Sequence, residues 1–173
     1  MREVLSLLAF FLFFLSRSLN YASVEKEKTL AMIKPDGVSG NYTTQIKSII
    51  LESGFNIVRE KMLQLNEETV AHFYAEHSGR SFFPNLMKYM TSGPVYIMVL
   101  EKLNAIFDWR NLIGPTDSRK AKVSHQNSIR AICGLDSERN CVHGSDSPQS
   151  AAREISFFFG EISGDAGSIH DEL

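Results

Sequence analysis

The chain has 173 residues, of which 43% are hydrophobic and 22% charged, a composition that suits one globular domain and excludes extended disorder. The net charge of −2 excludes a general attraction to nucleic acid, so a phosphate site would need a local group of cations. Cys133 and Cys141 are too few for a disulfide-based scaffold. They could pair in an oxidising compartment, but two cysteines alone give little reason to expect a bond.

The first residues have the layout of a secretory signal. Arg2 precedes the apolar run 5–15, and small polar residues follow over 16–23. This pattern predicts a cleaved signal peptide over 1–23, the alternatives being an uncleaved anchor or a buried first helix. A membrane-spanning helix needs roughly 20 apolar residues, and this run is shorter, so we expect no stable membrane span.

The C-terminal sequence is typical of a targeting signal. Residues 170–173 read HDEL, a retention signal of the endoplasmic reticulum, and residues 160–173 as a whole are predicted to be a flexible tail. Together with the signal peptide they predict the endoplasmic reticulum lumen as the location. Asn41 begins an N-glycosylation acceptor (Asn-Tyr-Thr), or alternatively serves as a helix N-cap.

The folded domain is expected over 25–159. Periodicity and turn residues predict strands over 29–34, 55–65, 94–100 and 141–143, and helices over 43–53, 83–90 and 104–112, with further helices that begin at the N-caps Asn66 and Ser147. Residues 114–127 are polar, lack periodicity and are predicted to be a loop. This order predicts an α+β fold, a ferredoxin-like βαββαβ sandwich with an antiparallel sheet and helices packed on it. A Rossmann sheet is disfavoured because no glycine-rich turn follows the first strand.

Residues 140–147 (NCVHGSDS) contain His143, the candidate catalytic histidine. Imidazole is largely uncharged near neutrality and can attack a phosphoryl group, provided that an acceptor holds its other ring nitrogen. Gly144, which has no side chain, would let a bulky phosphate approach His143. Cys141 and His143 could instead be two metal ligands on one strand, but no further ligand pair lies nearby.

Residues 140–147 resemble the active-site signature of nucleoside diphosphate kinases. The resemblance covers nearly the whole core, because TLAMIKPDGV (29–38), KYMTSGPV (88–95) and SIR (128–130) also match in the same order. The resemblance implies an enzyme that transfers the terminal phosphoryl group of ATP to nucleoside diphosphates through a phosphohistidine on His143. The alternative is a catalytically weak nucleotide-binding module that acts as an interaction partner.

The resemblance also implies the roles of other residues. Glu154 would orient His143, and Ser145 would support that contact. The remaining residues implied to bind nucleotide are Lys34, Arg110, Arg130 and Thr116 at the phosphates, Asn140 near the ribose, Tyr74 near the histidine, and Phe82 and Leu86 at the base. Mg²⁺ would be bound with the nucleotide, with Asp146 as a helper through water. Lys120 and Lys122 are interpreted as solvated surface.

The chain departs from the family pattern between 114 and 130. This stretch is about three residues longer than usual by the resemblance, and Ser118 stands where the family has a proline. Ser137 replaces an apolar residue near the base. Because this loop and the C-terminal segment help family members to form hexamers, the resemblance allows a homo-oligomer without fixing its size.

Overall fold

The computed structural model describes residues 26–160. The predicted signal peptide and the tail from 161 onward lie outside these residues. Within the described part, no helix is both long and apolar enough to cross a membrane.

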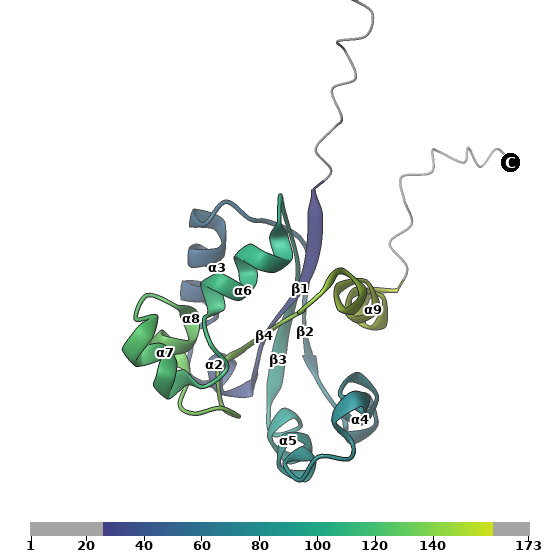
Figure 1. Ribbon diagram of the computed structural model, residues 1–173. Helices are drawn as coiled ribbons and strands as arrows, with labels where there is room; N and C mark the ends of the chain where they lie inside the picture. The colour runs from purple at the N-terminus through teal and green to yellow at the C-terminus, as the bar shows by residue number, and fades with distance from the viewer. Residues whose placement is uncertain (1–25, 161–173) are drawn as a thin grey trace, which may run out of the picture.

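The described residues form one four-stranded sheet with helices between successive strands (Figure 1). The strands are β1 (Glu27–Ile33), β2 (Asn56–Gln64), β3 (Pro94–Lys102) and β4 (Val142–Gly144). The helices are α2 (Pro35–Ser39), α3 (Thr43–Glu52), α4 (Glu67–Phe73), α5 (Phe83–Met90), α6 (Ala105–Ile113), α7 (Ser118–Ser124), α8 (Ile129–Cys133) and α9 (Pro148–Phe159), with a 3₁₀ turn η1 (Ala75–His77) after α4.

The strand order is β2-β3-β1-β4, and each neighbouring pair is antiparallel. This order confirms the predicted ferredoxin-like α+β fold. β1 and β3 are the two inner strands. The residues of β1 alternate between two buried clusters, with Ala31 and Ile33 on one face and Leu30 and Met32 on the other. The helices pack on the sheet as expected and cover both of its faces: α3, α6 and α8 cover one face, while α4, α5 and α9 cover the other (Figure 1).

Two local predictions were wrong. The stretch 114–127 is not all loop, because α7 begins after Asp117, whose side chain accepts a hydrogen bond from the Arg119 amide. Ser118 and Ala121 are fully buried, so tertiary packing gives this polar segment a helix that its periodicity does not reveal. Asn41 is not a helix N-cap: it has a φ of 62°, and Tyr42 takes the N-cap position of α3.

The cysteines form a disulfide, contrary to the expectation of unpaired thiols. The Cys133–Cys141 bond joins the end of α8 to the residue before β4, with 5.8 Å between the two Cα atoms. The reason is tertiary: α8 and β4 are neighbours in space, and the loop 134–140 turns back between them. Cys141 is therefore not available as a metal ligand, and the described residues contain no group of three His, Cys, Asp or Glu side chains that could hold a metal ion.

Candidate active site

His143 is positioned by the pairing of β4 with β1. It lies opposite Met32, so its side chain points to the same face as Met32. On that face the ring packs edge-on against Phe73 and Tyr74, with centroid distances of 5.4 and 6.2 Å. The His143 side chain is 21% exposed. The fold therefore fixes the ring between aromatic neighbours and leaves part of it accessible.

A buried carboxylate orients the imidazole. His143 Nε2 lies 2.9 Å from Glu154 Oε2, and Ser145 Oγ donates to the same oxygen at 2.8 Å. Ser145 Oγ also accepts a hydrogen bond from the Leu30 amide of β1 at 3.2 Å. Because a carboxylate accepts hydrogen bonds, the proton of the neutral ring resides on Nε2, and Nδ1 keeps its lone pair.

The helix that carries Glu154 begins as the sequence predicts. Ser147 and Ser150 form a reciprocal capping box at the N-terminus of α9. Ser147 Oγ accepts from the Ser150 amide at 3.1 Å, and Ser150 Oγ accepts from the Ser147 amide at 2.9 Å. This cap starts α9 just after β4 and holds Glu154 two turns into the helix, facing His143.

His143 opens on a cavity of about 480 Å³. The cavity brings together the predicted site residues Lys34, Tyr74, Phe82, Leu86, Arg110, Thr116, Arg130, Asn140, His143, Asp146 and Glu154. Ser145 does not line it and is fully buried. Sequence reasoning missed Phe73, Glu76, His77 and Glu138, which also line the cavity. Phe73 carries only the signal of a core residue, and no local pattern indicates the η1 residues.

Three cations face this cavity from different elements. Lys34 is 7% exposed, and its Nζ donates to Asn140 Oδ1 at 2.8 Å and to the Glu138 carbonyl at 3.4 Å. Arg130 is also 7% exposed and donates to the carbonyls of Gly114 and Val142, at 2.8 and 3.1 Å. These hydrogen bonds orient the two buried cations, and their acceptors are carbonyl and amide oxygens, not carboxylates.

Burial destabilises the charged forms of Lys34 and Arg130. It lowers the pKa of Lys34 to about 8, with the nearby charge of Arg130 acting in the same direction. It lowers the pKa of Arg130 to about 10, with the charge of Arg110 adding to the effect. Arg110 is more exposed, and its Nη1 approaches the Gly144 carbonyl at 3.4 Å. A bound phosphate would relieve the mutual repulsion of these groups.

The far part of the cavity is less polar. Leu86 of α5 is buried, whereas Phe82, just before α5, is 46% exposed and lies 5.7 Å from the His77 ring. Asn140, which also lines the cavity, donates through Nδ2 to the carbonyls of Thr116 and Ser137, each at 3.0 Å. Tyr74 is buried, its Oη has no partner among the described residues, and burial raises its pKa.

Asp146 suits the indirect role expected for it. Its carboxylate lines the cavity and accepts from Ser150 Oγ at 2.6 Å, a hydrogen bond that lowers its pKa. A single ionised carboxylate fits a magnesium ion held mainly by phosphate oxygens and water, because Mg²⁺ in nucleotide sites uses few protein ligands.

Gly144 is also required by packing on the other face of the sheet. A Cβ at this position would lie 2.4 Å from the Trp109 ring, whose Nε1 donates to the His143 carbonyl at 3.3 Å. The missing side chain therefore makes room for Trp109 of α6, on the face of the sheet opposite the His143 side chain.

Gly144→Ala is expected to lower the free energy of unfolding by about 1–3 kcal/mol through overpacking against this buried ring. Gly79→Ala is the matched control, because nothing lies within 4 Å of a Cβ built at Gly79. Chemical denaturation of the two variants measures the difference. Equal stabilities would contradict the steric role of Gly144.

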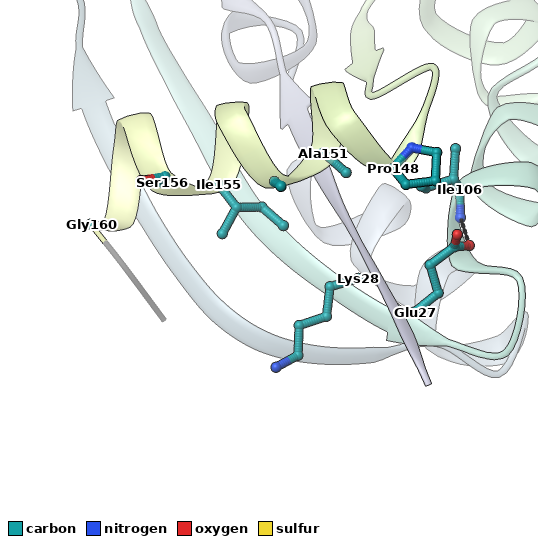
Figure 2. A pocket seen from close by; sticks show the side chains of 9 residues that line it. Glu27, Lys28, Ile106, Pro148, Ala151, Ile155, Ser156 and Gly160 are labelled. Atoms are coloured by element: carbon teal, nitrogen blue, oxygen red, sulfur yellow. Dashed lines mark hydrogen bonds between the residues drawn. The ribbon is translucent and has the colours of Figure 1, made fainter. Parts of the chain in front are cut away.

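A second cavity, of about 520 Å³, shares no residue with the first (Figure 2). It lies between the start of β1 and α9, and much of its wall consists of small or apolar side chains such as Ala151 and Ile155. Glu27 also lines this cavity, and its carboxylate accepts a hydrogen bond from the Ile106 amide at 2.9 Å. Lys28 is the only cation in its lining, so this cavity lacks the charge of a phosphate site.

The first cavity places an oriented imidazole and three cations around one opening, a combination suited to phosphate chemistry. The chain belongs to the nucleoside diphosphate kinase family, whose family model matches residues 27–163.

Individual relatives agree with this assignment. The chain is 67% identical over 144 residues to "Probable nucleoside diphosphate kinase 5" of Arabidopsis thaliana, covering 82% of this chain and 100% of that protein. It is 48% identical to human "Nucleoside diphosphate kinase homolog 5", covering 79% of this chain and 63% of the human protein. Among solved structures, the nucleoside diphosphate kinase of Aquifex aeolicus superposes with a TM-score of 0.77 at 42% identity, over 78% of this chain and 96% of the other.

Proposed function

We propose that this protein is a nucleoside diphosphate kinase that transfers the terminal phosphoryl group of ATP to nucleoside diphosphates through a phosphohistidine. The observation that carries the proposal is the 2.9 Å contact of His143 Nε2 with buried Glu154, beside a cavity lined by Lys34, Arg110 and Arg130. Family membership supports nucleotides as the substrates.

In the first half-reaction, Nδ1 of His143 attacks the γ-phosphorus of ATP. The nitrogen–phosphorus bond forms as the bond from phosphorus to the bridging oxygen of ADP breaks, and ADP leaves with that oxygen. The ring becomes positively charged, and Glu154 stabilises this charge through the Nε2 proton. In the second half-reaction, a terminal phosphate oxygen of a nucleoside diphosphate attacks the same phosphorus. The oxygen–phosphorus bond forms as the Nδ1–phosphorus bond breaks, which releases the nucleoside triphosphate and restores the neutral ring.

The three cations stabilise the charge that spreads over the phosphoryl oxygens during transfer. Mg²⁺ bound to the phosphates, with Asp146 nearby, would supply further charge neutralisation. The half-exposed Phe82 ring offers a stacking surface beside Leu86. A stacked base is recognised by its π-face more than by its edge, so we expect the enzyme to accept several nucleotides.

The direct test uses purified protein and ATP labelled at the γ-phosphate. The expected product is an acid-labile label on His143, which unlabelled GDP removes as labelled GTP. Nucleotide binding without any labelled histidine or GTP would contradict the kinase and support the nucleotide-binding module.

Glu154→Gln is expected to lower kcat by about 10–100-fold while KM changes by less than about threefold. The amide keeps the size of the side chain but cannot neutralise the charged ring that forms during transfer. Glu67→Gln, at an exposed position in the first turn of α4, is the control. Steady-state kinetics of both variants with ATP and GDP measure the effect, and an unchanged kcat in Glu154→Gln would remove Glu154 from the mechanism.

We further propose that the protein acts in an oxidising compartment, as the expected location in the endoplasmic reticulum lumen requires. The Cys133–Cys141 bond supports this proposal, because disulfides persist mainly in such compartments. A fluorescent protein inserted after residue 24 tests it, and uniform cytosolic fluorescence would contradict it.

A further inference from the structure

The loop 134–140 forms one wall of the nucleotide cavity. Ser137, Glu138 and Asn140 line the cavity from this loop. The residues on either side of the loop are Cys133 and Cys141, which the disulfide joins. The covalent bond therefore closes a short ring of main chain that includes part of the substrate site.

This loop also positions groups outside itself. The Lys34 ammonium donates to Asn140 Oδ1 and to the Glu138 carbonyl, at 2.8 and 3.4 Å. Asn140 Nδ2 donates to the Thr116 carbonyl at 3.0 Å. A displacement of the loop would therefore move a phosphate-facing cation and the chain around Thr116.

Cys141 has an uncommon backbone conformation. Its φ is 71°, in the left-handed region that non-glycine residues rarely adopt. Its amide donates to Asp36 Oδ2 at 3.0 Å, and its carbonyl accepts from the Lys34 amide at 2.8 Å. A Cβ added to Gly37 would lie only 2.8 Å from Cys141 Sγ. The disulfide therefore packs directly against Gly37 in α2. The bond helps to hold this strained residue between Asn140 and β4.

The histidine end of the site is held by other elements. Glu154 lies on α9, Ser145 Oγ is bonded to the Leu30 amide of β1, and the His143 carbonyl accepts from Trp109 of α6. None of these contacts involves loop 134–140. Loosening the loop should thus affect nucleotide binding more than the orientation of the nucleophile.

We propose that Cys133 and Cys141 are positioning residues of the nucleotide site, whose disulfide preorganises loop 134–140 around Lys34 and the bound nucleotide. This inference rests on the proposed function for its choice of ligand. A dithiol breaks the Sγ–Sγ bond by donating two electrons and two protons, which yields two cysteine thiols and an oxidised dithiol. The reduced loop must then be ordered when nucleotide binds, which weakens binding.

The test compares oxidised wild type, wild type reduced with dithiothreitol, and the double variant Cys133→Ser/Cys141→Ser. Thiol alkylation and mass spectrometry establish the state of the bond. Because the chain contains two cysteines, any redox effect on the protein itself must come from this pair. Reduction and the double substitution are each expected to raise KM for GDP about 5–10-fold, with kcat changed by less than about threefold. Reoxidation of wild type should restore KM, and the double variant should not respond to dithiothreitol.

Circular dichroism and thermal melts verify that each form is folded at the assay temperature. If the double variant does not fold, reversible reduction of wild type carries the test. A KM ratio below threefold between reduced and oxidised wild type overturns the inference, as does a fall in kcat with unchanged KM.

The outcome can be separated from that of the proposed function. If wild type forms no phosphohistidine, the kinase proposal fails, and the dissociation constant of ADP replaces KM with the same threefold threshold. Hydrogen exchange gives a readout without nucleotide. The amides of Leu135 and Asp136, which donate to the Arg139 carbonyl at 2.7 and 3.2 Å, should exchange at least about threefold faster after reduction. Absence of both nucleotide binding and any change in this exchange overturns the inference as well.

Discussion

His143→Ala is expected to abolish the phosphoenzyme and to lower kcat by at least about 10⁴-fold. In the proposed mechanism the ring nitrogen carries the phosphoryl group between two nucleotides, and alanine offers no replacement. The cations and the aromatic side chain of the cavity remain, so the dissociation constant of ADP should change by less than about fivefold. Labelling with γ-labelled ATP, together with calorimetric titration of ADP, separates these two effects.

His125→Ala is the matched control for this substitution. His125 is exposed, follows α7 and does not line the nucleotide cavity. This variant should label as wild type does. Label retained in His143→Ala would show that another group carries the phosphoryl group and would end the proposed mechanism.

Lys34→Gln is expected to lower kcat/KM by about 10²–10³-fold, since it removes a buried cation from the phosphoryl site. Its effect should depend on pH. Burial and Arg130 lower the pKa of Lys34 to about 8, while the nearby carboxylates of Asp36, Glu138 and Asp136 act in the opposite direction. The Tyr89 ring also lies 5.7 Å from the ammonium.

The sign of the pH effect follows from which form is charged. Below about pH 8 the free protein keeps the ammonium, and above it the charge is progressively lost. Wild-type kcat/KM, which reports the free enzyme, should therefore fall as the pH rises above about 8. Bound phosphates favour the charged form, so kcat at saturating nucleotide should persist to higher pH.

Lys34→Gln should lack this alkaline decrease in kcat/KM, and exposed Lys120→Gln should keep it. Profiles of kcat/KM between pH 6 and 10 measure the difference. An alkaline limb of the same midpoint in Lys34→Gln would assign the titration to another group.

Much of the site could be predicted from local sequence because its residues lie in short, recognisable segments. The segment around His143 and the one ending at Lys34 are each continuous in the chain, and the fold brings β4 beside β1 as the order of elements predicts. His77 and Glu138 could not be found in this way. They reach the cavity from a 3₁₀ turn and an irregular loop, whose direction depends on packing elsewhere.

The sequence by itself determined the order of the four strands and the family resemblance, because both depend on local residue patterns. The resemblance in turn identified the candidate nucleophile and its carboxylate. Tertiary structure decided that helices cover both faces of the sheet, that Gly144 makes room for Trp109, and that Cys133 reaches Cys141. It also decided the lowered pKa of Lys34. These features depend on burial and on the distances between elements, which become defined only when the elements pack together.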